Sequence, residues 1–391
     1  MLRLGAAQTL AWASSYYLPA MLAVPMARDL GMSTATVFAA FSGALIVCAL
    51  AGPFAGWAID RHGGRRVLPA TNLLFAAGLV AMAVAQSPGA LGLGWLLVGL
   101  GMGAGLYEAA FATLVRLHGP GARGAITGIT LIAGFASTVG WPLSAWMEAQ
   151  WGWRGACVGW ATLHLVVGLP LNLSLPRVGS DGGPVAGAAG LESSGATGVA
   201  PAPPAAGAAA LRTTVLLSFV FAVTWFTSTA MAAHLPRLLQ ASGIPLQAAV
   251  AMAALVGPAQ VAARLLEFGL LRRLHPLLSA QLAAAAHPVG AALLMVAGGP
   301  AVALVFTVLH GAGNGILTIA KGTLPLVLFG PAGYGARQGL MMVPARVAQA
   351  FAPLAFGLLL DSVGAEALWL TLLLGAAALG ALWMLRPLAR S

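Results

Sequence analysis

The chain has 391 residues, of which 60% are hydrophobic and only 7% are charged. Soluble domains average about 25% charged residues, so this composition excludes a fold in water and indicates one in lipid. The formal net charge of +10 comes from basic residues that stand singly or in pairs between apolar runs. This pattern is typical of loops beside anionic lipid, and it argues against binding of nucleic acid.

Apolar runs of the roughly 20 residues that a spanning helix needs occur six plus six times along the chain. Arg3 precedes the first run and no small-residue cleavage site follows, which favours a first span over a removed signal peptide. We predict an all-α membrane protein with twelve transmembrane helices, in two six-helix bundles at 1–175 and 213–391. The expected spans are 5–27, 35–58, 67–86, 90–115, 125–147, 155–174, 213–236, 246–271, 277–297, 301–329, 339–360 and 366–387.

Residues 176–212 lie between the two sets and consist largely of Gly, Ala, Pro and Ser, without an apolar period. A segment so poor in large side chains cannot form a core, so we predict a flexible cytoplasmic linker. The cysteines Cys48 and Cys157 lie in apolar runs and indicate neither a disulfide framework nor a metal site.

The distribution of arginine predicts the orientation in the membrane. With the N-terminus inside, thirteen arginines are cytoplasmic: Arg3, Arg61, Arg65, Arg66, Arg116, Arg123, Arg177, Arg212, Arg272, Arg273, Arg337, Arg386 and Arg390. The opposite side receives only Arg28, Arg154 and Arg237. This positive-inside bias predicts a multi-pass protein of the inner (cytoplasmic) membrane, with both termini in the cytoplasm.

The loop between the second and third spans reads GWAIDRHGGRR, residues 56–66. Gly56 allows close helix approach, Asp60 can pair with a helix N-terminus or an arginine, and Gly63 supports a tight turn. The loop resembles the signature loop of the major facilitator superfamily, and with six plus six spans and a linker the resemblance covers nearly the whole chain. It implies two pseudo-symmetric bundles, a midplane site between them and alternating access. It also implies a gating role for the loop, whose fixed residues are Gly56, Asp60, Arg61, Gly63, Arg65 and Arg66.

A weaker second copy of this loop follows the eighth span. Glu267 precedes Arg272 and Arg273 with the spacing that Asp60 has to Arg65 and Arg66, but the glycines are not repeated. Glu267 is therefore either a helix-end acid of a second latch or part of a proton relay.

Four ionisable groups share one depth inside the predicted spans. Counted at 1.5 Å per residue, Glu108, Arg264 and Lys321 lie about 12 Å from the cytoplasmic helix ends, and Arg346 about 10 Å. Each charge costs at least about 2.5–3.5 kcal/mol at such a position. Arg346 could still extend to the lipid headgroups. Three cations against Glu108, and against Glu267 if it is buried, leave a positive excess that an anionic substrate would offset.

Several polar and aromatic residues are spaced to line the same cavity. His310, Asn314, Thr318 and Lys321 form one stripe of a helix, although a lone histidine such as His310 is more often a core residue. The complete set of expected substrate-binding residues is Arg264, Lys321, Arg346, Asn314, His310, Tyr16, Tyr17 and Trp225. The candidates for proton coupling are Glu108, Glu267 and His310.

One basic residue in each of the eighth and eleventh spans resembles the monocarboxylate transporter and oxalate–formate antiporter branch. In that branch such residues hold carboxylates, and Arg264 and Arg346 are the matching positions. The aspartate that many proton-coupled members carry four residues before the helix-8 arginine is Gln260 here. Proton symport, antiport and uniport therefore all stay open, as do import and export.

The sequence thus predicts a secondary active transporter of a small organic anion, either a mono- or a dicarboxylate. The alternative is a proton-coupled exporter of drugs or other small hydrophobic or cationic compounds. No catalytic cluster, metal-ligand spacing or nucleotide-binding motif occurs, so we expect no enzyme, no cofactor and no metal. The expected partners are the substrate, membrane lipid, and protons or a counter-substrate, with the chain acting as a monomer.

Overall fold

A computed structural model describes residues 1–176, 207–270 and 274–385. These ranges are almost wholly helical and contain no strand, so the predicted all-α class is confirmed. The predicted linker lies outside the described residues from 177 to 206. Arg177, Arg272, Arg273, Arg386 and Arg390 also lie outside them, together with the basic part of the second latch.

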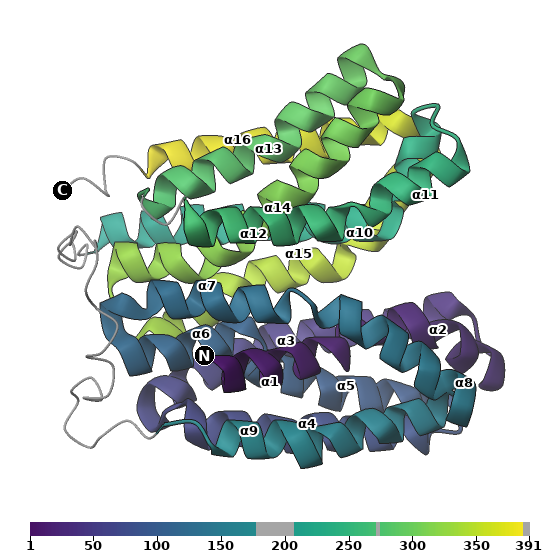
Figure 1. Cartoon of the computed structure of the whole chain (residues 1–391), viewed down its shortest axis with the longest axis vertical. Coiled ribbons are helices and arrows are strands. Elements are labelled where there is room, and N and C mark those ends of the chain that lie inside the picture. Colours follow the sequence, from purple (N-terminus) through teal and green to yellow (C-terminus); the bar gives the residue numbers. More distant parts are fainter. Residues whose placement is uncertain (177–206, 271–273, 386–391) are drawn as a thin grey trace. The chain divides into compact units, whose positions relative to one another are not determined.

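The chain divides into two compact units. The first unit comprises the described residues of Met1–Gly195 and also Pro331–Val343, and the second unit those of Ala196–Gly330 and Pro344–Ser391. The first unit contains α1 (Leu2–Ala13), α2 (Leu18–Asp29), α3 (Thr34–His62), α4 (Gly64–Ala83), α5 (Pro88–Gly105), α6 (Tyr107–His118), α7 (Ala122–Ala133), α8 (Ala136–Leu163) and α9 (Leu169–Leu173) (Figure 1).

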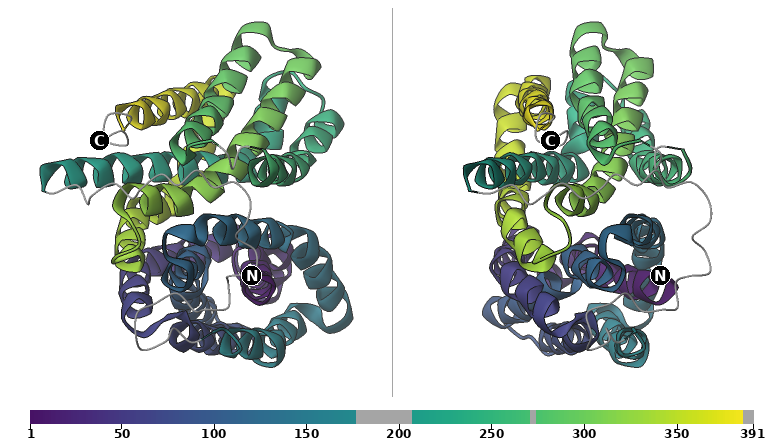
Figure 2. Two further views of the ribbon diagram at one scale, coloured as in Figure 1. Left: turned by 60° about the vertical axis from the view of Figure 1, so that its left-hand side comes forward. Right: turned by 90° about the vertical axis from the view of Figure 1, so that its left-hand side faces the viewer.

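The second unit contains α10 (Ala208–Ala241), α11 (Leu246–Ala254), α12 (Val256–Gly269), α13 (Pro276–Ala297), α14 (Gly299–Phe329) and α16 (Leu368–Met384). The remaining helix, α15 (Tyr334–Val363), belongs to the first unit up to Val343 and to the second unit beyond it. Figure 2 shows the helices of each unit from two further sides.

Eight helical stretches of the described chain are long and apolar enough to cross a membrane. Two of them, Pro88–Leu173 with 86 residues and Tyr334–Met384 with 51, are long enough for more than one crossing. Each of the predicted spans coincides with helix. The bounds of the spans differ from those of the helices for two reasons. Some spans contain a break in the helix, and some helices continue into the next predicted span.

The breaks in the helices have local causes. The chain leaves the helix at Leu106, inside the predicted span 90–115, and at Gly152 of α8, between the spans 125–147 and 155–174, where φ is +69°. The break after α5 leaves the carbonyl oxygen of Gly105 without a helical partner. The buried side-chain amide of Gln8 donates to this oxygen from Nε2 at 2.7 Å. A polar side chain thus replaces the missing helical hydrogen bond, as a membrane interior requires.

Glycines of α14 let three helices of the second unit pack closely. A Cβ on Gly311 or Gly315 would lie 2.7 Å or 2.6 Å from a carbonyl oxygen of α12, that of Val256 or of Gln260. A Cβ on Gly313 would lie 2.6 Å from the carbonyl oxygen of Ala283 on α13. Small residues at such contacts allow backbones to approach in membrane helix packing. This approach fixes α12, α13 and α14, which carry most of the polar residues considered below.

We predict that Gly315→Ala destabilises the protein by about 1–3 kcal/mol, because the added methyl group overpacks the contact between α14 and α12. The measurement is thermal unfolding in detergent. Gly257→Ala on α12 is the matched control, because a Cβ there meets nothing within 4 Å. Equal unfolding temperatures for the two variants would contradict the close contact.

Candidate functional site

Four charged side chains of the described residues are fully buried, and all four lie in the second unit. Arg264 is 6% exposed, Glu267 3%, Lys321 5% and Arg346 2%. The other two described carboxylates of this unit, Asp361 and Glu366, are exposed. Three buried cations and one buried carboxylate give a net charge of +2 in the interior of the unit, before any ligand is considered.

Trp225 of α10 connects two of these cations. The Lys321 Nζ atom lies 3.9 Å from the centroid of the indole ring, and the Arg346 Cζ atom lies 4.7 Å from it. The negative face of an aromatic ring stabilises a cation at these distances, and does so more strongly where water is excluded. The ring thus holds an ammonium of α14 and a guanidinium of α15 beside one side chain, and it does so without cancelling their charge.

Neutral oxygens position the two guanidinium groups. Arg264 Nε donates to the carbonyl oxygen of Gly315 at 3.4 Å, and its Nη2 donates to Gln260 Oε1 at 3.5 Å. Arg346 Nη1 donates to Gln349 Oε1 at 2.9 Å. These contacts orient planar donor groups that suit a carboxylate or another oxyanion. Gln260 stands at the position where proton-coupled relatives of the predicted branch carry an aspartate.

Glu267 follows Arg264 by three residues and lies in the last turn of α12. It is the buried carboxylate of this unit, so it reduces the local positive charge but does not balance it. Its role as latch or relay stays a prediction, because Arg272 and Arg273 lie outside the described residues.

His310 and Asn314 form the other end of the predicted stripe on α14. His310 Nδ1 lies 3.0 Å from the Nδ1 atom of His287 on α13, a partner that sequence reasoning did not identify. His287, His310 and Asn314 border a cavity of about 40 Å³ between α10, α13, α14 and α16. The stripe therefore has two parts, a histidine pair at the cavity and Lys321 at Trp225.

Tyr16 and Tyr17 lie in the first unit, in the break between α1 and α2. The ring of Tyr16 packs on Trp12 and Phe41, at centroid distances of 5.3 Å and 5.8 Å. The ring of Tyr17 packs on Trp141 at 5.9 Å. Both tyrosines thus belong to an aromatic cluster of the first unit and are half-buried, while the buried cations lie in the second unit.

Glu108 lies in the first turn of α6, directly after the break at Leu106. A carboxylate is stabilised at a helix N-terminus by the partial positive charge there. Glu108 is half-buried and belongs to the first unit, and its assignment to the site stays a prediction.

The predicted gating loop joins α3 to α4, and its glycines have clear steric reasons. Gly63 has φ +80°, a conformation that favours glycine. A side chain on Gly56 would collide with the backbone of Gly335. Asp60 Oδ1 and Oδ2 accept from the backbone N–H groups of Gly335 and Ala336, each at 2.9 Å. Asp60 therefore caps the N-terminus of α15, within the part of that helix that belongs to the first unit.

The arginines of the loop have different surroundings. Arg61 lies over the ring of Trp57, with Cζ 5.4 Å from its centroid, and Arg65 Nη1 donates to the carbonyl oxygen of Leu175 at 2.7 Å. Arg66 is exposed. Arg116 of α6 donates to the carbonyl oxygen of Asp60, which fixes the loop on the end of α6.

Sequence reasoning also missed a buried serine–histidine–asparagine cluster in the first unit. Ser14 Oγ lies 2.7 Å from His164 Nε2, and His164 Nδ1 lies 3.1 Å from Asn72 Oδ1. Ser14 and His164 have no exposed surface, so no substrate can reach this hydroxyl. The cluster satisfies polar groups where three helices meet. The signal was available, because Asn72 and His164 both interrupt predicted spans.

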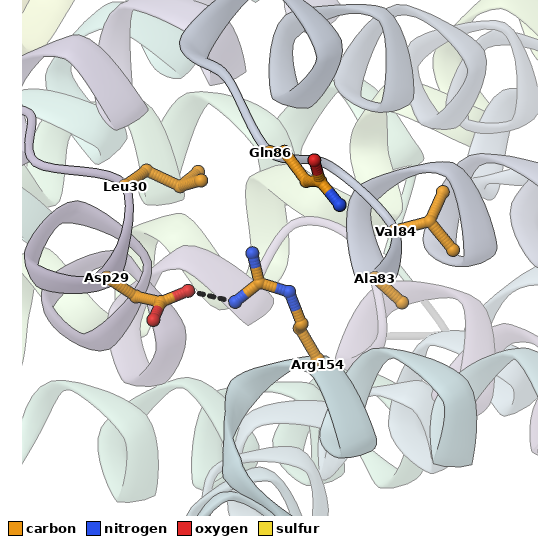
Figure 3. A pocket seen from close by; sticks show the side chains of 6 residues that line it. All are labelled: Asp29, Leu30, Ala83, Val84, Gln86 and Arg154. Carbon is orange, nitrogen blue, oxygen red and sulfur yellow. Dashed lines mark hydrogen bonds and ion pairs between the residues drawn. The ribbon is translucent and has the colours of Figure 1, made fainter.

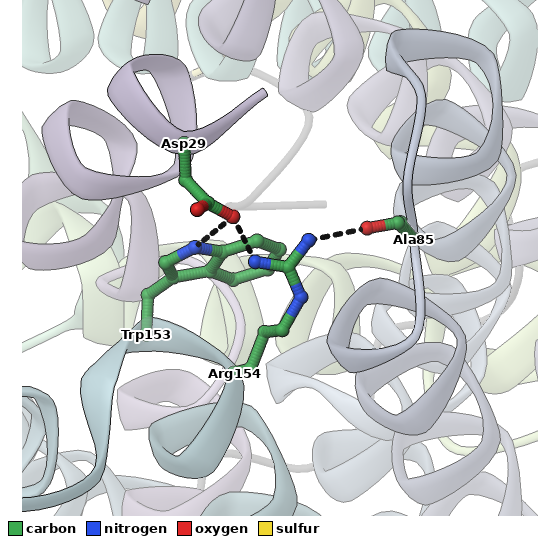
Figure 4. Close-up of polar contacts among 4 residues, drawn as sticks. All are labelled: Asp29, Ala85, Trp153 and Arg154. Atoms are coloured by element: carbon green, nitrogen blue, oxygen red, sulfur yellow. Dashed lines mark hydrogen bonds and ion pairs between the residues drawn. The ribbon is translucent and has the colours of Figure 1, made fainter. Parts of the chain in front are cut away.

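A second pocket, of about 710 Å³, is open and lies in the first unit, at the ends of α2 and α4 and beside the break of α8 at Gly152 (Figure 3). Arg154 donates to Asp29 across it and to the carbonyl oxygen of Ala85, and Trp153 donates to the same carboxylate (Figure 4). The arginine of this pocket is thus already bound to an acid. In the second unit, Arg237 likewise pairs with Asp361, so two of the three arginines predicted on the outer side are neutralised.

An all-helical fold of apolar spans with ionised groups in its interior defines a polytopic membrane protein of the transporter class. The chain belongs to the Major Facilitator Superfamily, whose sequence description it matches over residues 4–320. The family predicted from the loop at 56–66 is therefore confirmed.

Among curated proteins, the chain is 36% identical over 148 residues to the multidrug resistance protein B homolog of two Mycobacterium tuberculosis strains, CDC 1551 / Oshkosh and ATCC 25618 / H37Rv. The match covers 37% of this chain, and it spans about a quarter, 26%, of the length of those relatives.

Solved structures share the fold at low sequence identity. The proton:xylose symporter XylE has a TM-score of 0.72 at 12% identity, with 98% of this chain and 95% of that chain covered. The human organic anion transporter MFSD10 (TETRAN) has 0.67 at 16%, covering 98% and 99%. The E. coli fucose:proton symporter FucP has 0.68 at 16%, covering 99% and 97%. At these identities the similarity shows the fold.

We predict that the stabilisation from Asp29 disappears in acid. The hydrogen bond from Arg154 holds the pKa of Asp29 below its usual 3.8, with a further contribution from Trp153. A depressed pKa stabilises the fold above the unfolded value and ceases to do so as the pH falls through the folded value. Wild type should therefore unfold at a higher temperature than Asp29→Asn at pH 7, and the difference should shrink below about pH 4. A difference that is constant down to pH 3 would contradict the pairing.

Proposed function

We propose that this protein is a secondary active transporter that moves a small organic anion, a mono- or dicarboxylate, across the inner membrane. It works as a monomer with both termini in the cytoplasm and uses alternating access. The observation that carries the proposal is the burial of Arg264, Lys321 and Arg346 in the second unit, with Glu267 as the one buried carboxylate among the described residues of that unit.

The argument is electrostatic. A net charge of +2 in an apolar interior is expensive, and the indole of Trp225 and the neutral oxygens of Gln260 and Gln349 orient the cations but carry no formal charge. A bound anion would lower this cost directly. The guanidinium groups favour a planar acceptor with two oxygens, which is the shape of a carboxylate. A carboxylate substrate also agrees with the resemblance of Arg264 and Arg346 to the basic pair of the monocarboxylate transporter branch.

The loop of residues 56–66 is proposed as a conformational gate. Asp60 holds the first turn of α15 through two backbone N–H groups, and this contact has only two hydrogen bonds to break and re-form. The same helix carries Arg346 further along its length. A movement at the start of α15 can therefore displace Arg346, which we assign to substrate binding.

The test is flux of labelled mono- and dicarboxylates into liposomes that contain the purified full chain. We expect Arg264→Gln and Lys321→Met each to lower transport at subsaturating anion by about 10- to 150-fold, because a hydrogen bond to a charged group is worth about 1.5–3 kcal/mol. Arg346→Gln should behave in the same way.

Arg237→Gln is the matched control, since Arg237 is an exposed arginine of the same unit that pairs with Asp361. It should transport at the wild-type rate, because exposed ion pairs contribute little. Normal transport by both Arg264→Gln and Lys321→Met would refute the anion site.

A second candidate is a proton-coupled exporter of hydrophobic or cationic compounds. The observation that favours it is the 36% identity, over 148 residues, to a protein named for multidrug resistance. In this case the functional charge is the half-buried Glu108 of the first unit, and the buried cations are structural.

The exporter hypothesis makes a different prediction. Overexpression should raise the resistance of the host to toxic cations such as ethidium by several fold, Glu108→Gln should abolish that resistance, and Lys321→Met should retain it. The anion transporter predicts no gain in resistance with any of the three proteins. The assay is growth inhibition, with protein levels in the membrane matched by immunoblot.

A further inference from the structure

The histidine pair of the second unit has a geometry that requires a shared hydrogen. His287 of α13 is 8% exposed and His310 of α14 is 4% exposed, and their Nδ1 atoms lie 3.0 Å apart. The rings meet edge to face, with centroids 5.0 Å apart and planes at 71°. At this distance one Nδ1 must donate and the other must accept. The two imidazoles are therefore in different tautomers, and together they can accept one further proton.

The cavity beside the pair is large enough for a water molecule and has several polar groups in a mostly apolar lining. Its volume is about 40 Å³, and a water molecule takes about 30 Å³ in the liquid. Besides the histidines, its polar lining residues are Thr224, Thr227, Ser228 and Asn314. Among the described residues, the buried atoms His287 Nε2 and Thr227 Oγ1 have no hydrogen-bond partner. Both residues border the cavity, and a water molecule there could satisfy these buried polar atoms.

We propose that the His287–His310 pair, with a water in this cavity, binds the proton that is coupled to transport, so that the protein is a proton–anion symporter. The identity of the cotransported ion as an anion rests on the function proposed above. The binding of a proton by the pair is inferred from the contact between His287 and His310 and does not depend on that function.

The step is a simple protonation. A proton that reaches the cavity water passes to the imidazole nitrogen that still has a free lone pair, and one N–H bond forms. The hydrogen between the two Nδ1 atoms stays shared, and the pair gains one positive charge. Release on the other side of the membrane breaks the same N–H bond, so protons and charge balance over a cycle.

The charged surroundings explain why the proton and the anion would travel together. The other ionisable side chains on α14 and its neighbours lie on four helices, while α11 and α16 carry none. They are Arg212, His234 and Arg237 on α10, Arg264 and Glu267 on α12, Lys321 on α14, and Tyr334, Arg337, Arg346 and Asp361 on α15. Lys321 lies eleven residues along α14 from His310, about 16 Å. His234 lies about 10 Å along α10 from Thr227, and its Nε2 contacts the carbonyl oxygen of Pro353.

The buried cations therefore oppose protonation of the pair until an anion neutralises them. A protonated pair in turn attracts an anion to the same unit. By linkage each ligand raises the affinity for the other by the same factor. This reciprocal effect favours symport, and it disfavours an antiporter in which proton and anion exclude one another.

The proton site can be tested without any substrate. In ¹⁵N-histidine NMR spectra of the full chain in nanodiscs, the signals missing from His287→Gln and from His310→Gln identify the pair. We expect these two signals to titrate together as the pH is lowered, because the pair shares one hydrogen and accepts a single further proton. His234→Gln is the matched control and should leave that titration unchanged. A pair that stays neutral down to pH 4.5, or titrates as two independent rings, would overturn the proposal.

Coupling is tested in proteoliposomes that contain the pH dye pyranine. An inward gradient of labelled oxalate or lactate should acidify the lumen with wild type. The ratio of protons to anions should fall at least tenfold in the His287→Gln/His310→Gln double variant. An unchanged ratio would overturn the coupling role. The reduced anion flux expected of Arg264→Gln tests the proposed anion site separately, because the NMR titration of the pair does not need that flux.

Discussion

Buried positive charge inside an apolar unit is the constraint on which the functional interpretation depends. Arg264, Lys321 and Arg346 are buried in a unit whose described residues include a single buried carboxylate, and Trp225, Gln260 and Gln349 help to orient them. A structural role alone would be better served by acids at the positions of Gln260 and Gln349. The amides present there orient the cations and carry no formal charge, which agrees with the proposed anion site.

Helix packing in the second unit makes this charge arrangement possible. Gly311, Gly313 and Gly315 bring the backbone of α14 against α12 and α13, so Arg264 can donate to the carbonyl oxygen of Gly315 and His310 can reach His287. With larger residues at these positions, the helices would separate, and the polar contacts would lengthen beyond hydrogen-bond distance. The glycine content that might suggest loops in a soluble protein therefore positions the site in this one.

Much of this could be predicted from the sequence, because a membrane imposes simple rules. Apolar run length predicted the spans, and the loop at 56–66 predicted the family that the comparison confirms. Arg264, Lys321 and Arg346 were identifiable because a charge inside a span is rare and costly.

What could not be predicted depends on side-chain contacts between distant helices. His287 is 23 residues from His310, and nothing local distinguishes it from any other polar residue in an alanine-rich helix. Tyr16 and Tyr17 pack on aromatic rings of the first unit, and an aromatic residue in a span has the same sequence pattern whether it packs or binds.

The two polar centres of the second unit are physically connected through the same two helices. Thr224 borders the histidine cavity and is followed directly by Trp225, which holds Lys321 and Arg346. On α14, Leu317 borders the cavity and lies one turn before Lys321. A shift of α10 against α14 therefore changes both centres at once. If the proton binds at one centre and the anion at the other, a single relative movement of two helices is enough to make the occupancy of each depend on the other, and no longer pathway between them is needed.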